Sequence, residues 1–437
     1  MSNFNHNLLM WLIFAITYIG IALGRFPRLV LDRTGVALVG AIAMLLAGAL
    51  SIKQAADYVD YETLLLLFGL MIFSAQLRVA GFYNRMGGML VRLIDRPRLL
   101  LAGVIAMAAV LSALLANDIV CLALAPLLCE SLLKARRDPI PYLLGLAMAS
   151  NIGSATTIIG NPQNMYIGTV ARLPFGHFTL MMLPVTLVAL GLCHVAIVWL
   201  CHRRLHERPA MEAAPADNEN TVHLISPPLK VIVPRFNGYL IGKTLLLLGI
   251  LVVYFLFARG PDASQHRAIA ALTGAGILLC SRRAMAAGLY QRVDWNLILL
   301  FLGLFVVNGA MSRQHLTDQL FNAVEHTGVP LDQPMSLTAV TLILSNLVSN
   351  VPAVLLLQPS VDAAARQAQS NQLWYVLALI STWAGNLTLV GSIANLIVAE
   401  SAARFGVRMD LKTYCKVGIP LTLLTCMIGV AWLIVMM

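Results

Sequence analysis

The stretch ASNIGSATTIIGNPQNMYIG (149–168) breaks an otherwise apolar region with three Asn, two Ser, two Thr, a Gln and a Pro. Gly153, Gly160 and Pro162 supply the backbone freedom or the interruption that ends a helix. Apolar residues resume in the same direction beyond the gap, so we predict a broken helix over 141–170. Its free N–H groups would attract anions, and its free carbonyls could ligate Na⁺.

The composition around this stretch is that of a membrane protein. The 437-residue chain is 59% hydrophobic and 11% charged, with a mean hydropathy of +0.81, which excludes a soluble globular protein. Several apolar runs approach the length of about 20 residues that a membrane helix needs. A membrane barrel would instead alternate polar and apolar residues in segments of about ten residues. We therefore expect an all-α polytopic membrane protein.

The second half of the chain repeats the first. The same motifs recur at offsets of 234, 233 and 231 residues, and such a small drift indicates two copies of one module. The matched segments are GRFPRLVLDRTGVALVGA (24–41) with ARGPDASQHRAIAALTGA (258–275), VDYETLLLLFGL (59–70) with VDWNLILLFLGL (293–304), ANDIVCLALAP (116–126) with SNVPAVLLLQP (349–359), and TIIGNPQN (157–164) with TLVGSIAN (388–395). We expect repeats at 1–204 and 239–437, joined by a polar, Pro-rich linker at 205–238.

Each repeat also contains a segment with two apolar arms and a polar turn. These segments, 99–133 and 335–360, carry AND (116–118) and SNVP (349–352) at the turn. We predict that both are re-entrant hairpins, whose tips are tolerated at membrane depth only where protein or water surrounds them. The second broken helix is expected at 373–400.

The distribution of charge fixes the orientation. With the N-terminus outside, 24 of the 30 Lys and Arg residues fall on one side of the membrane, as the positive-inside rule requires. This pattern also explains the net charge of +10 without a nucleic-acid partner. It gives five crossings per repeat, so the second repeat is inverted. We expect both termini on the outer side and the linker in the cytoplasm.

The polar clusters at the hairpin tips and in the broken helices are the candidate site. A single Ser, Thr or Asn in a membrane helix usually bonds to a neighbouring helix, but four discontinuities matched in pairs indicate a transporter site. The candidate binding residues are Asn117, Asp118, Ser150, Asn151, Ser154, Thr157, Gly160, Asn161, Asn164, Ser349, Asn350, Thr388, Gly391, Ser392 and Asn395. Oxygen ligands suit a hard cation, and the possible Na⁺ ligands are Asn117, Asp118, Gly160, Asn350 and Gly391.

Asp118 is the exceptional member of this set. A carboxylate at membrane depth is costly and is therefore functional by default. It would carry the proton or the cation, unless it only caps the backbone of its hairpin. The matching position in the second repeat is Val351, so the two tips are not equivalent.

Asn-containing tips and the GNPQN loop (160–164) resemble the ion transporter superfamily of divalent-anion/Na⁺ symporters, citrate transporters, arsenite permeases and NhaD-type antiporters. The resemblance covers nearly the whole chain apart from the linker. It implies substrate and cation binding between the tips of two inverted repeats, and a homodimer. The symporters have Ser-Asn-Thr tips, whereas the AND tip looks more like the arsenite-permease branch and related permeases.

These observations predict an ion-coupled secondary transporter of the inner membrane, moving a small anion or an oxyanion acid by alternating access. The expected partners are a small anionic solute, a coupling cation (Na⁺ or H⁺) and the lipid bilayer, and we expect no further cofactor. Two alternatives remain open: a Na⁺/H⁺ antiporter that uses Asp118, and an arsenite efflux permease. No HExxH, GxSxG, P-loop or paired-carboxylate motif occurs in the sequence, so we do not expect an enzyme.

Overall fold

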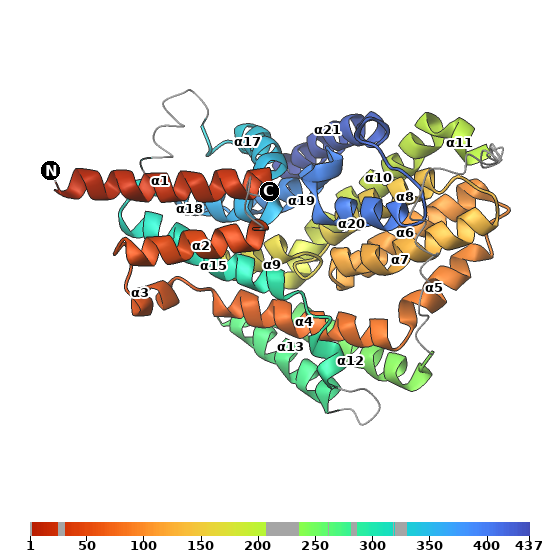
Figure 1. Ribbon diagram of the computed structural model, residues 1–437, viewed down its shortest axis with the longest axis horizontal. Helices are drawn as coiled ribbons and strands as arrows, with labels where there is room; N and C mark the ends of the chain where they lie inside the picture. The colour runs from red at the N-terminus through yellow and green to blue at the C-terminus, as the bar shows by residue number, and fades with distance from the viewer. Residues whose placement is uncertain are drawn as a thin grey trace, which may run out of the picture.

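The computed structural model describes residues 2–24, 31–206, 236–260, 262–280, 286–317, 319 and 330–437, and this part of the chain is helical and contains no strand. Seven of its helices are long and apolar enough to cross a membrane. Leucine and isoleucine side chains of α1, α12 and α21 are exposed on the outer surface, as expected for helices that face lipid. The expected all-α polytopic fold is confirmed (Figure 1).

The helices fall into two series with the same order. The first series consists of α1 (Ser2–Leu23), α2 (Arg33–Leu46), α3 (Ile52–Asp57), α4 (Tyr61–Val79), α5 (Phe82–Val91), α6 (Pro97–Leu114), α7 (Asn117–Lys134), α8 (Ile140–Ser154), α9 (Pro162–Val170) and α10 (Phe175–Leu200), followed by α11 (His202–His206). The second consists of α12 (Gly238–Phe257), α13 (Ala263–Leu279), α14 (Ala286–Tyr290), α15 (Trp295–Arg313), α17 (Pro334–Val348), α18 (Asn350–Ala368), α19 (Gln372–Trp383), η1 (Ala384–Asn386), η2 (Leu389–Gly391), α20 (Ile393–Ala403) and α21 (Leu411–Met436).

Matching residues start matching helices. Asp60 caps α4 by accepting a hydrogen bond from the backbone N–H of Thr63, at 3.0 Å. Asp294 caps α15 in the same way, through the N–H of Leu297 at 3.1 Å. An N-cap carboxylate satisfies free N–H groups and complements the positive end of the helix dipole. Both acidic residues therefore act as helix caps at corresponding positions of the two repeats.

Contacts between α4 and α15 show that the second repeat is inverted. Trp295, at the start of α15, lies against Phe68 of α4, with 5.9 Å between ring centroids. Gly309, near the end of α15, packs on Tyr58, which precedes α4. The two matching helices therefore run in opposite directions.

The repeats interlock to form a scaffold. Helix α4 packs on α13 of the other repeat, and α15 packs on α2. The approach is close in both pairs, because Gly69 of α4 touches the backbone of Ala271 and Gly303 of α15 touches that of Ala37. We call α1 to α4 and α12 to α15 the scaffold, and α6 to α10 and α17 to α21 the transport helices.

The transport helices contain both expected hairpins and both expected broken helices. The hairpins are α6–α7, with its turn at 115–116, and α17–α18, with its turn at 349; the second extends to Ala368, beyond the expected end at 360. The broken helices are α8–α9 and α19–α20, and every residue of α8 is buried. Most of the expected linker, together with Arg25, Arg28, Arg282 and Arg283, lies outside the described residues.

Candidate functional site

The two hairpin tips meet the two broken helices at one small cavity of about 30 Å³. Its lining residues are Asn117, Asp118, Pro162, Gln163, Leu297, Ser349, Asn350, Val351, Ser392 and Ile393. A cavity of this size can hold a water molecule. In this conformation the cavity accommodates a water molecule or a small ion.

Four helices begin at this cavity. Their first residues, Asn117 of α7, Pro162 of α9, Asn350 of α18 and Ile393 of α20, are all in its lining. Each helix start carries the positive end of a helix dipole, although Pro162 has no N–H group and the Asn164 and Ala394 N–H groups donate to the cap side chains of Asn161 and Ser392. Because no Lys or Arg lines the cavity, these four helix ends are its source of positive potential.

Two polar side chains in the lining are without partners. The Asp118 carboxylate is half-buried, and it makes no hydrogen bond or ion pair within the described part of the chain. The side-chain oxygen of Asn350 is fully buried and likewise unpaired. A buried oxygen left unpaired costs about 1–3 kcal/mol, which a ligand bonded to Asn350 would recover, and the half-buried Asp118 carboxylate is also available to a ligand.

The backbone at the second tip is strained. Ser349 has φ 77° and ψ 161°, a region that is otherwise almost reserved for glycine. Strain of this kind persists where the surrounding structure imposes it, and it is concentrated at functional sites. The strained residue, Ser349, directly precedes Asn350, whose side-chain oxygen is unpaired.

Asn151 of α8 connects both repeats behind the cavity. Its side-chain oxygen accepts hydrogen bonds from Asn117 Nδ2 and Ser392 Oγ, each at 3.1 Å. Its Nδ2 donates to the side-chain oxygens of Asn386 at 2.9 Å and Asn395 at 3.1 Å. The amide group is therefore fully satisfied and rigidly held.

Thr382 of α19 occupies the matching position in the other repeat. Its Oγ1 donates to the Ala378 carbonyl of its own helix at 2.8 Å and accepts a hydrogen bond from Asn161 Nδ2 at 3.1 Å, and Asn164 Oδ1 lies 3.4 Å away. Asn161 and Asn164 correspond to Ser392 and Asn395 at the offset of 231. The two hydrogen-bond networks are thus related by the inverted repeat.

The symmetry of the networks fails at the tips. Asn117 donates to Asn151, whereas the matching Asn350 makes no such bond to Thr382. Asp118 is likewise replaced by Val351. The first tip supplies a free carboxylate, and the second supplies a free amide oxygen.

The remaining candidates hold the breaks together. Thr157 Oγ1 donates to Ala113 O of the first hairpin, and Thr388 Oγ1 donates to Asn346 Oδ1 of the second at 3.1 Å. Ser150 and Ser154 bond to backbone carbonyls within α8. A Cβ at Gly160 would lie 2.1 Å from the Ser154 carbonyl oxygen, and one at Gly391 would lie 2.6 Å from Asn346 Oδ1.

The structure therefore separates the fifteen candidates into two sets. Those that line the cavity are Asn117, Asp118, Ser349, Asn350 and Ser392. Those that lie outside its lining are Ser150, Asn151, Ser154, Thr157, Gly160, Asn161, Asn164, Thr388, Gly391 and Asn395. Of the five possible Na⁺ ligands, Asn117, Asp118 and Asn350 are at the cavity, whereas Gly160 and Gly391 are at tightly packed points of the breaks.

Sequence reasoning missed part of the lining and part of the network. It missed Pro162, Gln163 and Ile393, although they are adjacent to predicted residues at helix starts, and Leu297 of the scaffold, for which the sequence gives no signal. It also missed Thr382 and Asn386. The offset of 231 from Asn151 points to Thr382 and would have found it.

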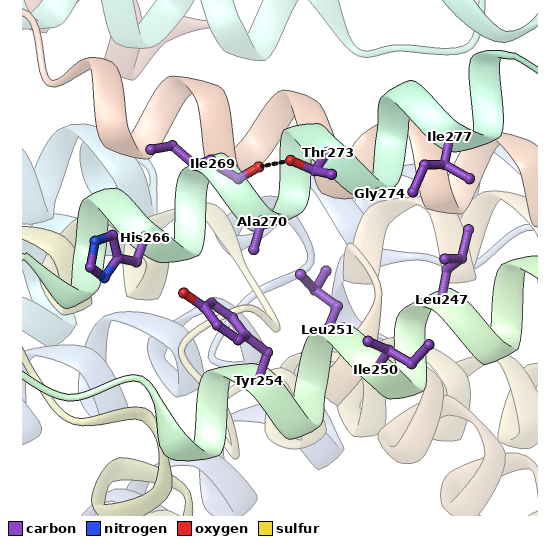
Figure 2. Close-up of a pocket in the computed structure, with 10 residues that line it drawn as sticks. All are labelled: Leu247, Ile250, Leu251, Tyr254, His266, Ile269, Ala270, Thr273, Gly274 and Ile277. Atoms are coloured by element: carbon purple, nitrogen blue, oxygen red, sulfur yellow. Dashed lines mark hydrogen bonds between the residues drawn. The ribbon is translucent and has the colours of Figure 1, made fainter.

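A larger cavity of about 340 Å³ lies between α12 and α13. Figure 2 shows that its lining is mainly aliphatic, and that the Thr273 hydroxyl donates to the Ile269 carbonyl of its own helix, at 2.8 Å. Ile250 and Ile269 are more than half exposed. A groove without convergent polar groups lacks the features of a small-molecule site.

Comparisons with known proteins agree with this architecture. Residues 9–384 match the CitMHS family, described as citrate transporter. The silicon efflux transporter LSI3 of Oryza sativa subsp. japonica is 30% identical, over 92% of this chain and 93% of the relative. A Dictyostelium discoideum protein that carries the transporter name arsB is 24% identical, over 92% and 87% of the two chains.

A solved structure has the same fold. The crystal structure of the YdaH transporter of Alcanivorax borkumensis, reported as having an unusual topology, matches with a TM-score of 0.59. The match covers 99% of this chain and 96% of that one, at 14% sequence identity. At this identity the likeness concerns the fold alone.

Proposed function

Because the chain belongs to the CitMHS citrate transporter family, we propose that it is an ion-coupled secondary transporter that binds a small oxyanion or oxyacid at the cavity between the hairpin tips. The resemblance seen in the sequence is confirmed at this level. The protein is a multi-pass membrane transporter and not an enzyme. Substrate, coupling ion and mechanism belong to the proposal.

The convergence of four helix starts on one cavity carries the proposal. Free N–H groups at helix N-termini bind anions without a cationic side chain, and the half-helices of other secondary transporters are used in this way. Asn117, Ser349 and Ser392 add polar side chains to the lining. These groups are suited to a solute that carries several oxygen atoms.

The size of the cavity favours a small substrate. At about 30 Å³ it would have to widen greatly for citrate, and less so for a small oxyacid. The rice relative is named for silicon efflux and the Dictyostelium relative arsB. We therefore place small oxyacids of the arsenite or silicate kind ahead of citrate.

Asp118 is the proposed carrier of the coupling charge. Its carboxylate would repel the ionised form of such an oxyacid unless a proton or a cation neutralised it. Binding of Na⁺ or H⁺ at Asp118, with the Asn350 oxygen as a further ligand for Na⁺, would therefore favour binding of the anion. The two binding events would be coupled through this single charge.

A flux assay in proteoliposomes tests the proposal. Arsenite, silicate, phosphate and citrate are supplied separately, with an imposed Na⁺ or pH gradient. We expect saturable uptake of one small oxyacid that depends on a gradient, and we expect Asp118→Asn to remove the dependence on Na⁺ or on pH. Retention of wild-type coupling in Asp118→Asn would refute the carrier role.

A Na⁺/H⁺ antiporter is the second candidate, because the cavity has room for an ion and contains one unpaired carboxylate. In this case a Na⁺ gradient would move protons with no anion present. Proton movement under these conditions, measured with a pH-sensitive dye inside the vesicles, would favour the antiporter. Its absence, together with anion uptake, would favour the symporter.

We also propose that the protein is a homodimer of the inner membrane, with both termini outside and the linker in the cytoplasm. The excess of Lys and Arg at one end of the helices supports this orientation. The homodimer rests on the resemblance to the superfamily alone.

A further inference from the structure

Arg267 of α13 joins the scaffold to the first broken helix. The side chain is 1% exposed; its Nη1 donates to the Leu173 carbonyl and its Nη2 to the Gly168 carbonyl, each at 3.0 Å. Both carbonyls are at the C-terminal end of α9, where a cation is favoured. The start of α9 lines the cavity, so Arg267 holds the far end of a helix that forms the site.

The second broken helix has the same acceptors. Helix α9 ends in a turn in which the Leu173 N–H donates to the Gly168 carbonyl at 3.1 Å. Helix α20 ends in an equivalent turn, in which the Val407 N–H donates to the Ala402 carbonyl at 3.1 Å. Arg172 and Gly406 have positive φ in the two turns, 52° and 76°, as this type of helix end requires.

The arginine that corresponds to Arg267 is Arg33, at the offset of 234 that also relates the two turns. Arg33 is half-buried at the start of α2, and it makes no hydrogen bond or ion pair with the described residues. One arginine of the pair is therefore engaged and the other is free. No arginine among the described residues donates to the Ala402 or Val407 carbonyl in this conformation.

The packing of the transport helices on the scaffold also differs between the two repeats, and it is closer in the first repeat, where Arg267 is engaged. Helix α9 packs on α4 and α10 packs on α12, whereas α20 and α21 make no comparable contact with α15 and α1 in the described part of the chain. Scaffold residue Leu297 of α15 also lines the cavity, but the matching Thr63 of α4 does not. The structure is thus one of two arrangements that an inverted repeat can adopt.

We propose that Arg33 and Arg267 are alternating positioning residues for the transport cycle. In this conformation Arg267 binds the carbonyls at the end of α9. In the opposite conformation the Arg267 hydrogen bonds are broken, and Arg33 binds the Ala402 and Val407 carbonyls at the end of α20. Hydrogen bonds from a charged donor are strong enough to bias such an equilibrium. The proposal rests on alternating access in the proposed function.

The released Arg267 side chain has a route to water. A cavity of about 510 Å³ lies at this end of α9, lined by Arg172, Pro174 and Ala263 among others, and Ala263 is one turn before Arg267 on α13. A guanidinium that enters this cavity replaces its hydrogen bonds to two carbonyls with hydrogen bonds to water. These bonds to water lower the free-energy cost of breaking the Arg267 contacts with Gly168 and Leu173.

Two cysteine pairs, each joined by a short bifunctional thiol reagent, report the two conformations. Phe175 of α10 and Phe255 of α12 are in contact here, with 5.7 Å between ring centroids, so the reagent should cross-link Phe175→Cys/Phe255→Cys in this conformation. The same offset gives Met409 and Ile21 as the counterpart pair. Ile21→Cys/Met409→Cys should cross-link in the opposite conformation only, in a background without the native cysteines.

We expect Arg267→Gln to lower the yield of the first pair relative to the second by about tenfold, and Arg33→Gln to change the ratio in the opposite direction. Arg267→Lys, which keeps a charged donor, should restore part of the ratio. The arginine variants should also change the transport rate more than the KM. Equal loss of both cross-links in Arg267→Gln, or no opposite change in Arg33→Gln, would overturn the pairing.

The test is separable from that of the proposed function. If no small anion or cation binds to the wild-type protein, the proposed substrate site fails, whatever the cross-links show. If substrate flux is coupled as expected but the two arginine variants do not shift the cross-links in opposite directions, the arginine pairing alone fails.

Discussion

Asn350 and Asn117 are matching residues with different surroundings. Asn117 donates to Asn151 at 3.1 Å, whereas the Asn350 oxygen is buried without a partner. In the proposed function one solute and one ion bind at the cavity together, so the two tips need not be equivalent. A ligand can bond to the free Asn350 oxygen at the second tip without breaking a hydrogen bond of the protein.

Alanine variants of these two residues should therefore differ. Asn350→Ala removes a group that makes no hydrogen bond in the protein through its oxygen, so we expect weaker ligand binding with little change in the thermal transition. Asn117→Ala breaks a buried hydrogen bond and should also destabilise the protein, by about 1–3 kcal/mol. Thermal unfolding with and without ligand separates the two effects, and equal destabilisation would contradict this reading.

Ser349 combines an ordinary side chain with a glycine-like backbone, φ 77° and ψ 161°. Ser349→Gly relieves the strain and should raise the thermal transition by an amount equivalent to about 1 kcal/mol. Ser349→Ala keeps the strain and serves as the matched control. A transition raised equally in both variants would show that the backbone is not the cause.

At the scale of elements, the breaks in α8–α9 and α19–α20 place the starts of α9 and α20 at the cavity. Each break is held by a threonine that bonds to the neighbouring hairpin, Thr157 in the first and Thr388 in the second. The helix ends are thus fixed relative to the hairpin tips. This arrangement keeps four positive helix ends pointing at one cavity.

Gly160 is the residue on which the first break depends. A Cβ at this position would lie 2.1 Å from the Ser154 carbonyl oxygen, so Gly160→Ala should push the two halves apart. We expect a loss of stability of about 2 kcal/mol or more, together with a loss of ligand binding. Gly191→Ala in α10, where a Cβ meets nothing within 4 Å, should leave both unchanged. Thermal unfolding and flux measurements on the two variants provide the comparison.

At the scale of the whole molecule, the repeats form a scaffold and a set of transport helices that share few polar links. Arg267 is one such link, and its position at the end of α9 ties the scaffold to the site. Because the cavity touches α15 of the scaffold and not the matching segment of α4, access to it is set by how the two parts are placed. Movement of one part against the other is the expected basis of transport.

The orientation in the membrane can be measured with single cysteines. Lys53 and Arg92 are both exposed and are expected on the outer and cytoplasmic sides. A membrane-impermeant maleimide should label Lys53→Cys in intact cells, and Arg92→Cys only after the membrane is opened. The native Cys280, which is exposed and also expected on the cytoplasmic side, is an internal control. Labelling of Arg92→Cys in intact cells would show that the topology is the reverse of the proposed one.

The sequence alone determined the all-α membrane fold class, the two inverted repeats, the re-entrant hairpins and the broken helices. These features follow from local properties: apolar length sets the spans, Gly, Pro and Asn interrupt them, and matched motifs reveal the repeat. The asymmetry between Asp118 and Val351 was also visible in the sequence. No local property, however, distinguishes a polar residue that faces a cavity from one that holds a break closed.

Only the tertiary structure decided that distinction. Ser349 and Asn350 line the cavity. Asn151 and Asn161 are polar residues of the same kind, but their side chains make hydrogen bonds between the two repeats. The tertiary structure also decided that Arg267 is engaged while Arg33 has no hydrogen-bond partner among the described residues. Both repeats carry this arginine, but the position of the transport helices against the scaffold brings only Arg267 into contact with the end of a broken helix among the described residues.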